Sequence, residues 1–114
     1  MGNAVLNISF EFALEIITYC ELLENKKRFV IARQLPKSGT SIGANIREAQ
    51  SAESKTDFIH KLKITAKEAD ETEYWLLLSK QSKSYQDPDI LLEKIISRKK
   101  LLSKIISTSK NSLK

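Results

Sequence analysis

The fold of this chain is decided by residues 41–78, which read SIGANIREAQSAESKTDFIHKLKITAKEADETEYWLLL. The first part of the stretch consists mostly of small residues, and the second carries apolar residues at helical spacing on two opposite faces. A helix built from small residues packs closely against another backbone, and one with two apolar faces needs neighbours on both sides. The stretch therefore predicts a helical bundle that also packs against copies of itself.

Turn-forming residues are scarce in the whole sequence. Only three Gly and two Pro occur among its 114 residues, whereas Leu, Ile, Lys, Glu and Ala dominate. This composition is typical of an all-α protein, and the length suits one domain with a single core. We therefore expect residues 1–114 to form one domain, with a tail that frays from about residue 107.

The periodicity of the apolar residues predicts four helices. They cover about residues 6–24, 29–52 and 54–82, and a fourth begins near residue 88. Because the connections are short, neighbouring helices are expected to run antiparallel. The predicted architecture is an up-down-up-down four-helix bundle.

Two of these helices begin with recognisable capping residues. Ser54 stands three residues before Asp57, as in a capping box that has Asp in place of the usual Glu or Gln. Asp87 is suited to the N-cap of the fourth helix, and Pro88 is suited to its first turn, where no amide donor is needed.

The second helix contains residues that weaken helices. Pro36 removes an amide donor, so we expect a kink or a short break near Leu35. Gly39 and Gly43 each cost about 1 kcal/mol relative to Ala in a helix interior, a loss that is usually offset by close approach of another backbone. The two glycines therefore predict a tight contact between this helix and a neighbour.

The third helix carries apolar residues on both sides. One face collects Phe58, Leu62, Ala66, Ala69 and Leu76. The other side holds Ile64, Trp75 and Leu78, which could be isolated surface residues or part of a wider core. Because Trp is enriched at the centres of protein interfaces, we favour a subunit interface and expect a homo-oligomer.

A known family shares the central pattern. The resemblance rests on the segment SIGANIREA, with Ser41, Gly43, Asn45, Arg47 and Glu48 as its motif, followed by Phe58, Leu62, Ala66, Glu68, Ala69, Glu71, Thr72, Glu73, Trp75 and Leu76. This pattern resembles the bacterial four-helix-bundle family of proteins encoded within intervening sequences of 23S ribosomal RNA genes, also called the S23 ribosomal protein family.

The resemblance implies a homo-oligomeric ring, typically a pentamer. A related branch, the accessory proteins of diversity-generating retroelements, forms such a barrel and binds a reverse transcriptase and nucleic acid. Most family members have no assigned biochemical activity. Pro36 departs from the uninterrupted helix that is more usual in the family.

Basic residues are concentrated toward the C-terminal end. The net charge of +5 combines seven basic and no acidic residues in 94–114 with a net charge of −2 in the first 93 residues. We expect phosphates to be bound by the fourth helix and the first connection, through Lys94, Arg98, Lys99, Lys100, Lys104, Lys26, Lys27 and Arg28. The first connection should meet Lys80 and Lys83 at one end of the bundle. The alternative is a solvated face followed by a disordered tail.

Catalytic and metal sites are not indicated. His60 is the only histidine, whereas a di-iron bundle needs two Glu-x-x-His motifs. Cys20, the only cysteine, lies in an apolar helical stretch and is expected to pack in the core of a protein from a reducing compartment. The carboxylates of residues 68–73 are expected to pair with Lys63 and Lys67. We predict no metal, no cofactor and no enzymatic activity.

The polar pair Asn45 and Glu48 lies one helical turn apart among small and apolar residues. It could satisfy buried groups and seat the second helix, or line a channel that contacts RNA. The favoured function is a non-enzymatic oligomeric scaffold that associates with ribosomal or other structured RNA. The alternative is a protein-docking adaptor without a nucleic-acid role. With no export signal or membrane span in sight, we expect a cytoplasmic protein with no membrane partner.

Overall fold

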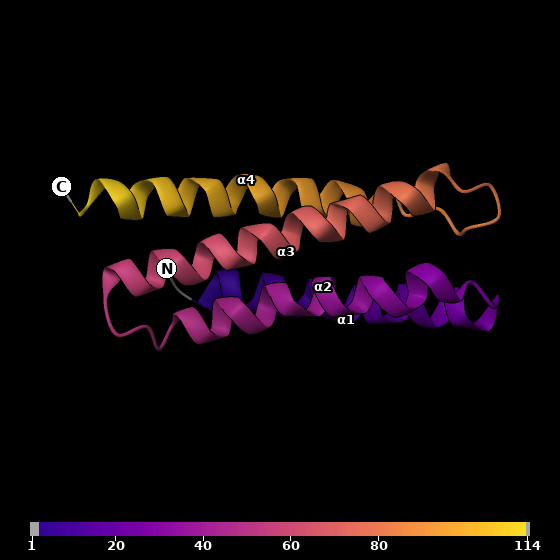
Figure 1. The fold of residues 1–114 in the computed structure, drawn as a ribbon, viewed down its shortest axis with the longest axis horizontal. Coiled ribbons are helices and arrows are strands. Elements are labelled where there is room, and N and C mark those ends of the chain that lie inside the picture. Colours follow the sequence, from indigo (N-terminus) through magenta and orange to yellow (C-terminus); the bar gives the residue numbers. More distant parts are fainter. Residues whose placement is uncertain (1–2, 114) are drawn as a thin grey trace.

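The computed structural model describes residues 3–113, which form four α-helices. α1 spans Asn3–Asn25, α2 spans Phe29–Ala49, α3 spans Lys55–Gln81 and α4 spans Asp89–Asn111. Successive helices run antiparallel along one long axis (Figure 1), in a body that measures 50 × 21 × 20 Å. The predicted all-α fold of four bundled helices is confirmed. Residues 1–2 and 114 of the predicted domain lie outside the described residues.

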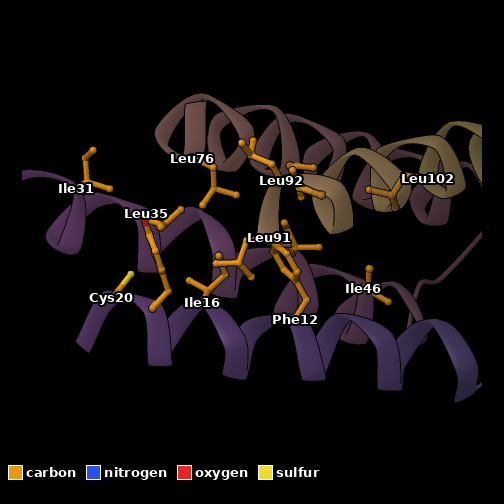
Figure 2. Close-up of a cluster of buried hydrophobic side chains, with 14 of the residues drawn as sticks. Phe12, Ile16, Cys20, Ile31, Leu35, Ile46, Leu76, Leu91, Leu92 and Leu102 are labelled. Carbon is orange, nitrogen blue, oxygen red and sulfur yellow. The ribbon is translucent and has the colours of Figure 1, made fainter. Parts of the chain in front are cut away.

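The core is built from positions that alternate three and four residues apart, the spacing of knobs-into-holes packing. On α3 these positions are Leu62, Thr65, Ala69, Thr72, Leu76 and Ser79, all of them buried. Figure 2 shows side chains from all four helices pointing into the same interior, among them Phe12, Leu35, Leu76 and Leu92. The hydroxyls of Thr72 and Ser38 lie 3.0 Å apart and join α3 to α2 inside this core.

The contact between α1 and α2 depends on the two glycines of α2. A Cβ added to Gly39 would lie 2.8 Å from Cγ2 of Ile16, closer than carbon atoms approach without a clash. A Cβ added to Gly43 would lie 3.3 Å from the backbone oxygen of Ser9. The predicted close approach is therefore confirmed, and its partner is α1.

Of the kink or short break predicted near Leu35, the break is absent, because α2 continues through Pro36 as one helix. Pro36 removes only the amide that would bind the carbonyl of Ala32. Leu35 and Ser38 on either side of it are fully buried. We attribute the continuity to this packing, which outweighs the local cost of the proline.

Several helix ends differ slightly from the prediction, and α1 begins at Asn3 instead of about residue 6. α2 stops at Ala49, and the amides of residues 50–52 bind carbonyls three residues earlier as the chain tightens into a turn. Ser54 caps α3 by accepting a hydrogen bond from the amide of Asp57 over 3.0 Å. Asp57 in turn accepts one from the amide of Glu53 rather than from the cap residue itself. α4 begins at Asp89 with Pro88 as its N-cap, so Asp87 and Pro88 each lie one residue before their predicted positions. Asp87 still accepts a hydrogen bond from the amide of Asp89 over 2.9 Å.

The last helix extends further than expected. We predicted fraying from about residue 107, but α4 remains helical to Asn111. Ile105 and Ile106 pack against the core at this end. Lys55 at the start of α3 also donates a hydrogen bond to the hydroxyl of Ser112 over 2.6 Å. These contacts hold the C-terminal turns of α4 in place.

The bundle is least tightly closed between its first and last helices. α2 packs along α1, α3 along α2 and α4 along α3, whereas α4 approaches α1 at few positions. We call this α1–α4 boundary the seam. An ion pair between Lys94 of α4 and Glu15 of α1 crosses it.

Candidate functional site

Charge is divided between the two halves of the α3–α4 hairpin. The antiparallel arrangement places the start of α3 beside the end of α4 (Figure 1). Residues 55–67 and 98–111, which we call the basic half, contain nine basic residues and one acidic residue. Residues 68–81 and 89–97, the acidic half, contain six acidic and two basic residues. The basic half extends the predicted α4 surface onto α3.

Two of the predicted phosphate-binding lysines are engaged in ion pairs within the chain. Lys94 contacts Glu15, as described above. Lys99 lies 2.8 Å from Asp70 and 2.6 Å from Glu73, at the boundary between the basic and acidic halves. Hydrogen bonds to Asp70 and then Glu73 raise the pKa of Lys99. Asp70 and Glu73 therefore pair across to α4, and within the described residues no carboxylate of residues 68–73 pairs with Lys63 or Lys67 as we expected.

The other predicted residues of α4 differ in exposure. Arg98 is half-buried, and its Nε atom is enclosed without a hydrogen-bond partner among residues 3–113. It lines a small internal cavity with Ser9 and Ile42. Lys100 and Lys104 are exposed, and neither forms an ion pair within the described residues. These two lysines are the members of the predicted α4 set that remain open to a partner.

The first and third connections meet at one end of the bundle, as the sequence predicts. Arg28 donates from Nε to the carbonyl of Ser84 over 3.2 Å. Lys26 reaches the side-chain oxygen of Gln86 at 3.4 Å. The hydroxyl of Tyr19 donates to the carbonyl of Gln86 over 2.6 Å and fixes the loop on α1. Basic residues at this end thus take part in holding the loop.

Lys27 and Lys80, which we also predicted to lie at this end, differ in their contacts. Lys27 is exposed, with a positive φ of 61°. Lys80 forms an ion pair with Asp89, which lies at the start of α4. Lys27 is therefore the more open of the two to a partner from solution.

The three residues predicted to form a subunit interface lie at different depths. Trp75 is half-buried and packs against the core, with its indole N–H enclosed and unpartnered among the described residues. Ile64 is also half-buried, whereas Leu78 is 37% exposed. The core around Trp75 therefore extends beyond the face of α3 that we predicted to be buried. That the three form a subunit interface remains a prediction.

A more exposed apolar surface lies on α1 and was missed by the sequence analysis. Phe10, Leu14 and Ile17 are 59%, 50% and 42% exposed. They line a groove between α1 and α2 that also includes Gly43 and Ala44. Their spacing of four and then three residues places them on one helix face, which is the signal that could have found them.

The family motif on α2 is only partly buried. Asn45 donates from Nδ2 to the carbonyl of Ser41 over 2.9 Å, within its own helix. Glu48 and Arg47 are both exposed, and Gly43 faces α1 as described above. The side chain of Asn45 thus satisfies local backbone, and Glu48 does not seat α2 against its neighbours.

Reactive and metal-binding groups are not brought together within the described residues. Cys20 is buried in the core as predicted, and burial raises the pKa of its thiol to about 12. His60 is exposed on α3. Among residues 3–113 no three His, Cys, Asp or Glu side chains converge as metal ligands. None of the helices in that range is long and apolar enough to cross a membrane.

Comparison with known proteins assigns the chain to a family. Residues 2–108 match the family model described as 23S rRNA-intervening sequence protein. The chain belongs to this family. A similar fold is seen in a crystal structure from Bacteroides thetaiotaomicron, described as a protein with unknown function from the S23 ribosomal protein family. That structure is 44% identical, and the match covers 90% of this chain and 97% of that one with a TM-score of 0.84. No functionally curated protein matched.

Proposed function

We propose that this 23S rRNA-intervening sequence protein is a non-enzymatic scaffold that assembles with copies of itself and associates with structured RNA through its basic half. The observation that carries the proposal is the division of charge along α3 and α4, with nine basic residues against one acidic residue in one half. Lys100 and Lys104 lie within that half, exposed and outside the ion pairs of the described residues. Such a surface attracts phosphates and releases their counterions.

The proposed assembly would serve the same function. A single bundle presents only a small patch of lysines, but a ring of identical subunits repeats it, so that several weak contacts act together. The exposed side chains of Phe10, Leu14 and Leu78 provide apolar surface for contacts between subunits. The proposed assembly is the pentameric ring that the family resemblance implies, in the cytoplasm.

The test measures mass and bound nucleic acid together. The purified protein is run on a sizing column with light scattering and absorbance at two ultraviolet wavelengths, at low and high salt. A ring several times the 13.0 kDa subunit, with nucleic-acid absorbance that high salt removes, is the expected result. A monomer would contradict the assembly.

Binding of a labelled RNA hairpin then locates the surface. The double substitution Lys100→Glu and Lys104→Glu should weaken binding and reduce the salt slope of log K by about 2, because each lysine contributes about 1. The matched control, Lys37→Glu with Lys83→Glu, changes the net charge equally outside the basic half. Equal losses in both variants would mean that net charge alone binds the RNA.

The second candidate is a protein-docking adaptor, and the apolar groove beside Phe10 and Gly43 favours it. A ring that purifies free of nucleic acid, and whose wild-type form binds the hairpin no more tightly than either double variant, would support this alternative. Its contact with a partner should then depend on apolar residues and change little with salt.

A further inference from the structure

Two grooves open along the seam between α1 and α4. One lies near the start of α4 and is lined mainly by apolar residues, including Leu14, Leu22 and Ile90. The other lies where α1 and α3 begin and α4 ends, which is the basic half of the hairpin. Its volume of about 620 Å³ is within the range of sites that hold ligands or anchoring side chains.

The second groove combines an apolar floor with a basic rim. The half-buried side chains of Val5, Phe58, Leu101 and Ile105 form the floor, and the exposed Lys55, Lys104 and Thr108 line it with Ser109. We call this site the basic groove. Among the described residues, the first groove has Glu15 in its lining and no lysine, so the two sites share apolar character and differ in charge.

We propose that the basic groove docks an acidic amphipathic segment of a partner protein. Apolar side chains of the segment lie on the floor, and its flanking carboxylates contact the ammonium groups of Lys55 and Lys104. Recognition of this kind places anchors at helical spacing into an apolar groove. The inference goes beyond the proposed association with RNA, because it gives the hairpin a protein partner.

The charges of the rim favour an anionic partner. Lys104 forms no ion pair with any residue in 3–113, and Lys55 contacts the neutral hydroxyl of Ser112. The end of α4 around the groove carries no acidic residue. A cationic or neutral apolar segment would leave these ammonium groups uncompensated, whereas carboxylates beside the apolar anchors would pair with them.

The chemistry of the floor favours a protein segment over RNA. Val5, Leu101 and Ile105 are aliphatic, and Phe58 is the single aromatic residue of the lining. Unpaired bases bind mainly by stacking on aromatic rings and by hydrogen bonds to their edges. Phosphates need no apolar floor, so they would be bound as well by the open lysines outside the groove.

The experiment uses the 114-residue chain and a fluorescent synthetic peptide. The peptide carries leucines at helical spacing flanked by glutamates, and a scrambled peptide of the same composition removes the amphipathic pattern. Affinity is measured by anisotropy, and thermal melting confirms that each variant folds. We expect the scrambled peptide to bind at least about tenfold more weakly, a difference of about 1.4 kcal/mol. Equal binding of the two peptides would overturn the proposal.

Two pairs of variants test the rim and the floor. The double substitution Lys55→Glu with Lys104→Glu should weaken peptide binding at least about tenfold. The control pair, Lys67→Glu with Lys100→Glu, makes the same change in charge outside the groove and should alter peptide binding by about twofold or less. Ile105→Ser should weaken binding several-fold, and Ile96→Ser, at a 42% exposed position of the same helix, should not.

Two outcomes contradict the proposal directly. Equal losses in the two lysine pairs would assign the binding to diffuse charge attraction. The second outcome is that a single-stranded RNA oligonucleotide displaces the peptide and no longer binds the Ile105→Ser variant. This result would assign the groove to unpaired bases. The lysine variants change exposed residues, so the test remains decisive if Ile105→Ser does not fold.

Discussion

In the α1–α2 hairpin, Gly39 and Gly43 allow a close approach of the helices, and a carbon atom added at Gly39 would clash with Ile16. In the α3–α4 hairpin, by contrast, Lys99 and Lys80 join the helices through ion pairs. Close packing of this kind is set by shape and responds little to salt. Ion pairs between partly exposed side chains are weak and are screened by salt. The two hairpins should therefore respond to different perturbations.

The largest expected effect is on the glycine contact. Gly39→Val should lower the free energy of unfolding by about 2 kcal/mol, because the new side chain overlaps Ile16 and overpacking outweighs the gain in helix propensity. Urea unfolding followed by circular dichroism measures the change. Ala44→Val, at an exposed position of the same helix, is the control and should cost much less. Equal losses would show that the contact tolerates added volume.

A smaller effect is expected where the two hairpins meet. Tyr19→Phe removes the hydrogen bond from α1 to the carbonyl of Gln86 and should cost about 1 kcal/mol at neutral pH. Urea unfolding at neutral pH measures this loss. An unchanged free energy of unfolding would show that the loop is held by its other contacts.

The same residue gives the first hairpin a dependence on alkaline pH. Burial raises the pKa of Tyr19 in the folded protein, so its contribution is present below the ordinary tyrosine pKa of 10.0. It is lost as the pH rises through the raised value, because the unfolded chain ionises first. Unfolding curves across this range should show a steeper decline in the wild type than in Tyr19→Phe. Parallel declines would contradict the role of Tyr19.

The smallest effect is expected at the ion pairs of the second hairpin. Lys99→Met should cost at most about 1 kcal/mol at low salt, because the lysine side chain is 35% exposed and its pairing is screened. The loss should shrink in high salt, and Lys100→Met provides a control without an ion pair in the described range. A loss that persists in high salt would mean that packing of the lysine stem dominates.

Lys99 also makes the second hairpin sensitive to alkaline pH. Its pKa is raised in the folded state by Asp70 and Glu73, so the stabilisation is present below the ordinary lysine value of 10.5 and is lost as the pH rises through the raised pKa. Comparing the wild type with Lys99→Met over that range isolates this contribution. Identical pH profiles would exclude it.

Much of the fold could be predicted because its signals are local. The capping residue Ser54, the apolar periodicity and the tight contact at Gly39 each follow from a few neighbouring residues. The continuity of α2 through Pro36 could not be predicted, because it depends on burial against other helices. Thr65, Thr72 and Ser79 were missed as core residues because their hydroxyls are satisfied by hydrogen bonds that the apolar pattern does not reveal.

The candidate site was less predictable than the fold. The excess of basic residues in α4 is visible in the sequence, but the partners of Lys94 and Lys99 come from other helices. Glu15 is 79 residues away from Lys94 along the chain, so only the fold shows that this charge is compensated. The basic groove is likewise formed by three helix ends that the sequence keeps apart.

The open seam between α1 and α4 also determines which part of the protein can move alone. α1 and α4 are each held mainly through one neighbour, α1 by the close glycine contact with α2, whereas α2 and α3 are each packed between two. Releasing α4 would therefore leave a three-helix unit intact, at a cost below that of global unfolding. The amide hydrogens of α4 should exchange with solvent deuterium before those of α2. In a cell, this last helix would be both the most basic element of the bundle and the first to leave it.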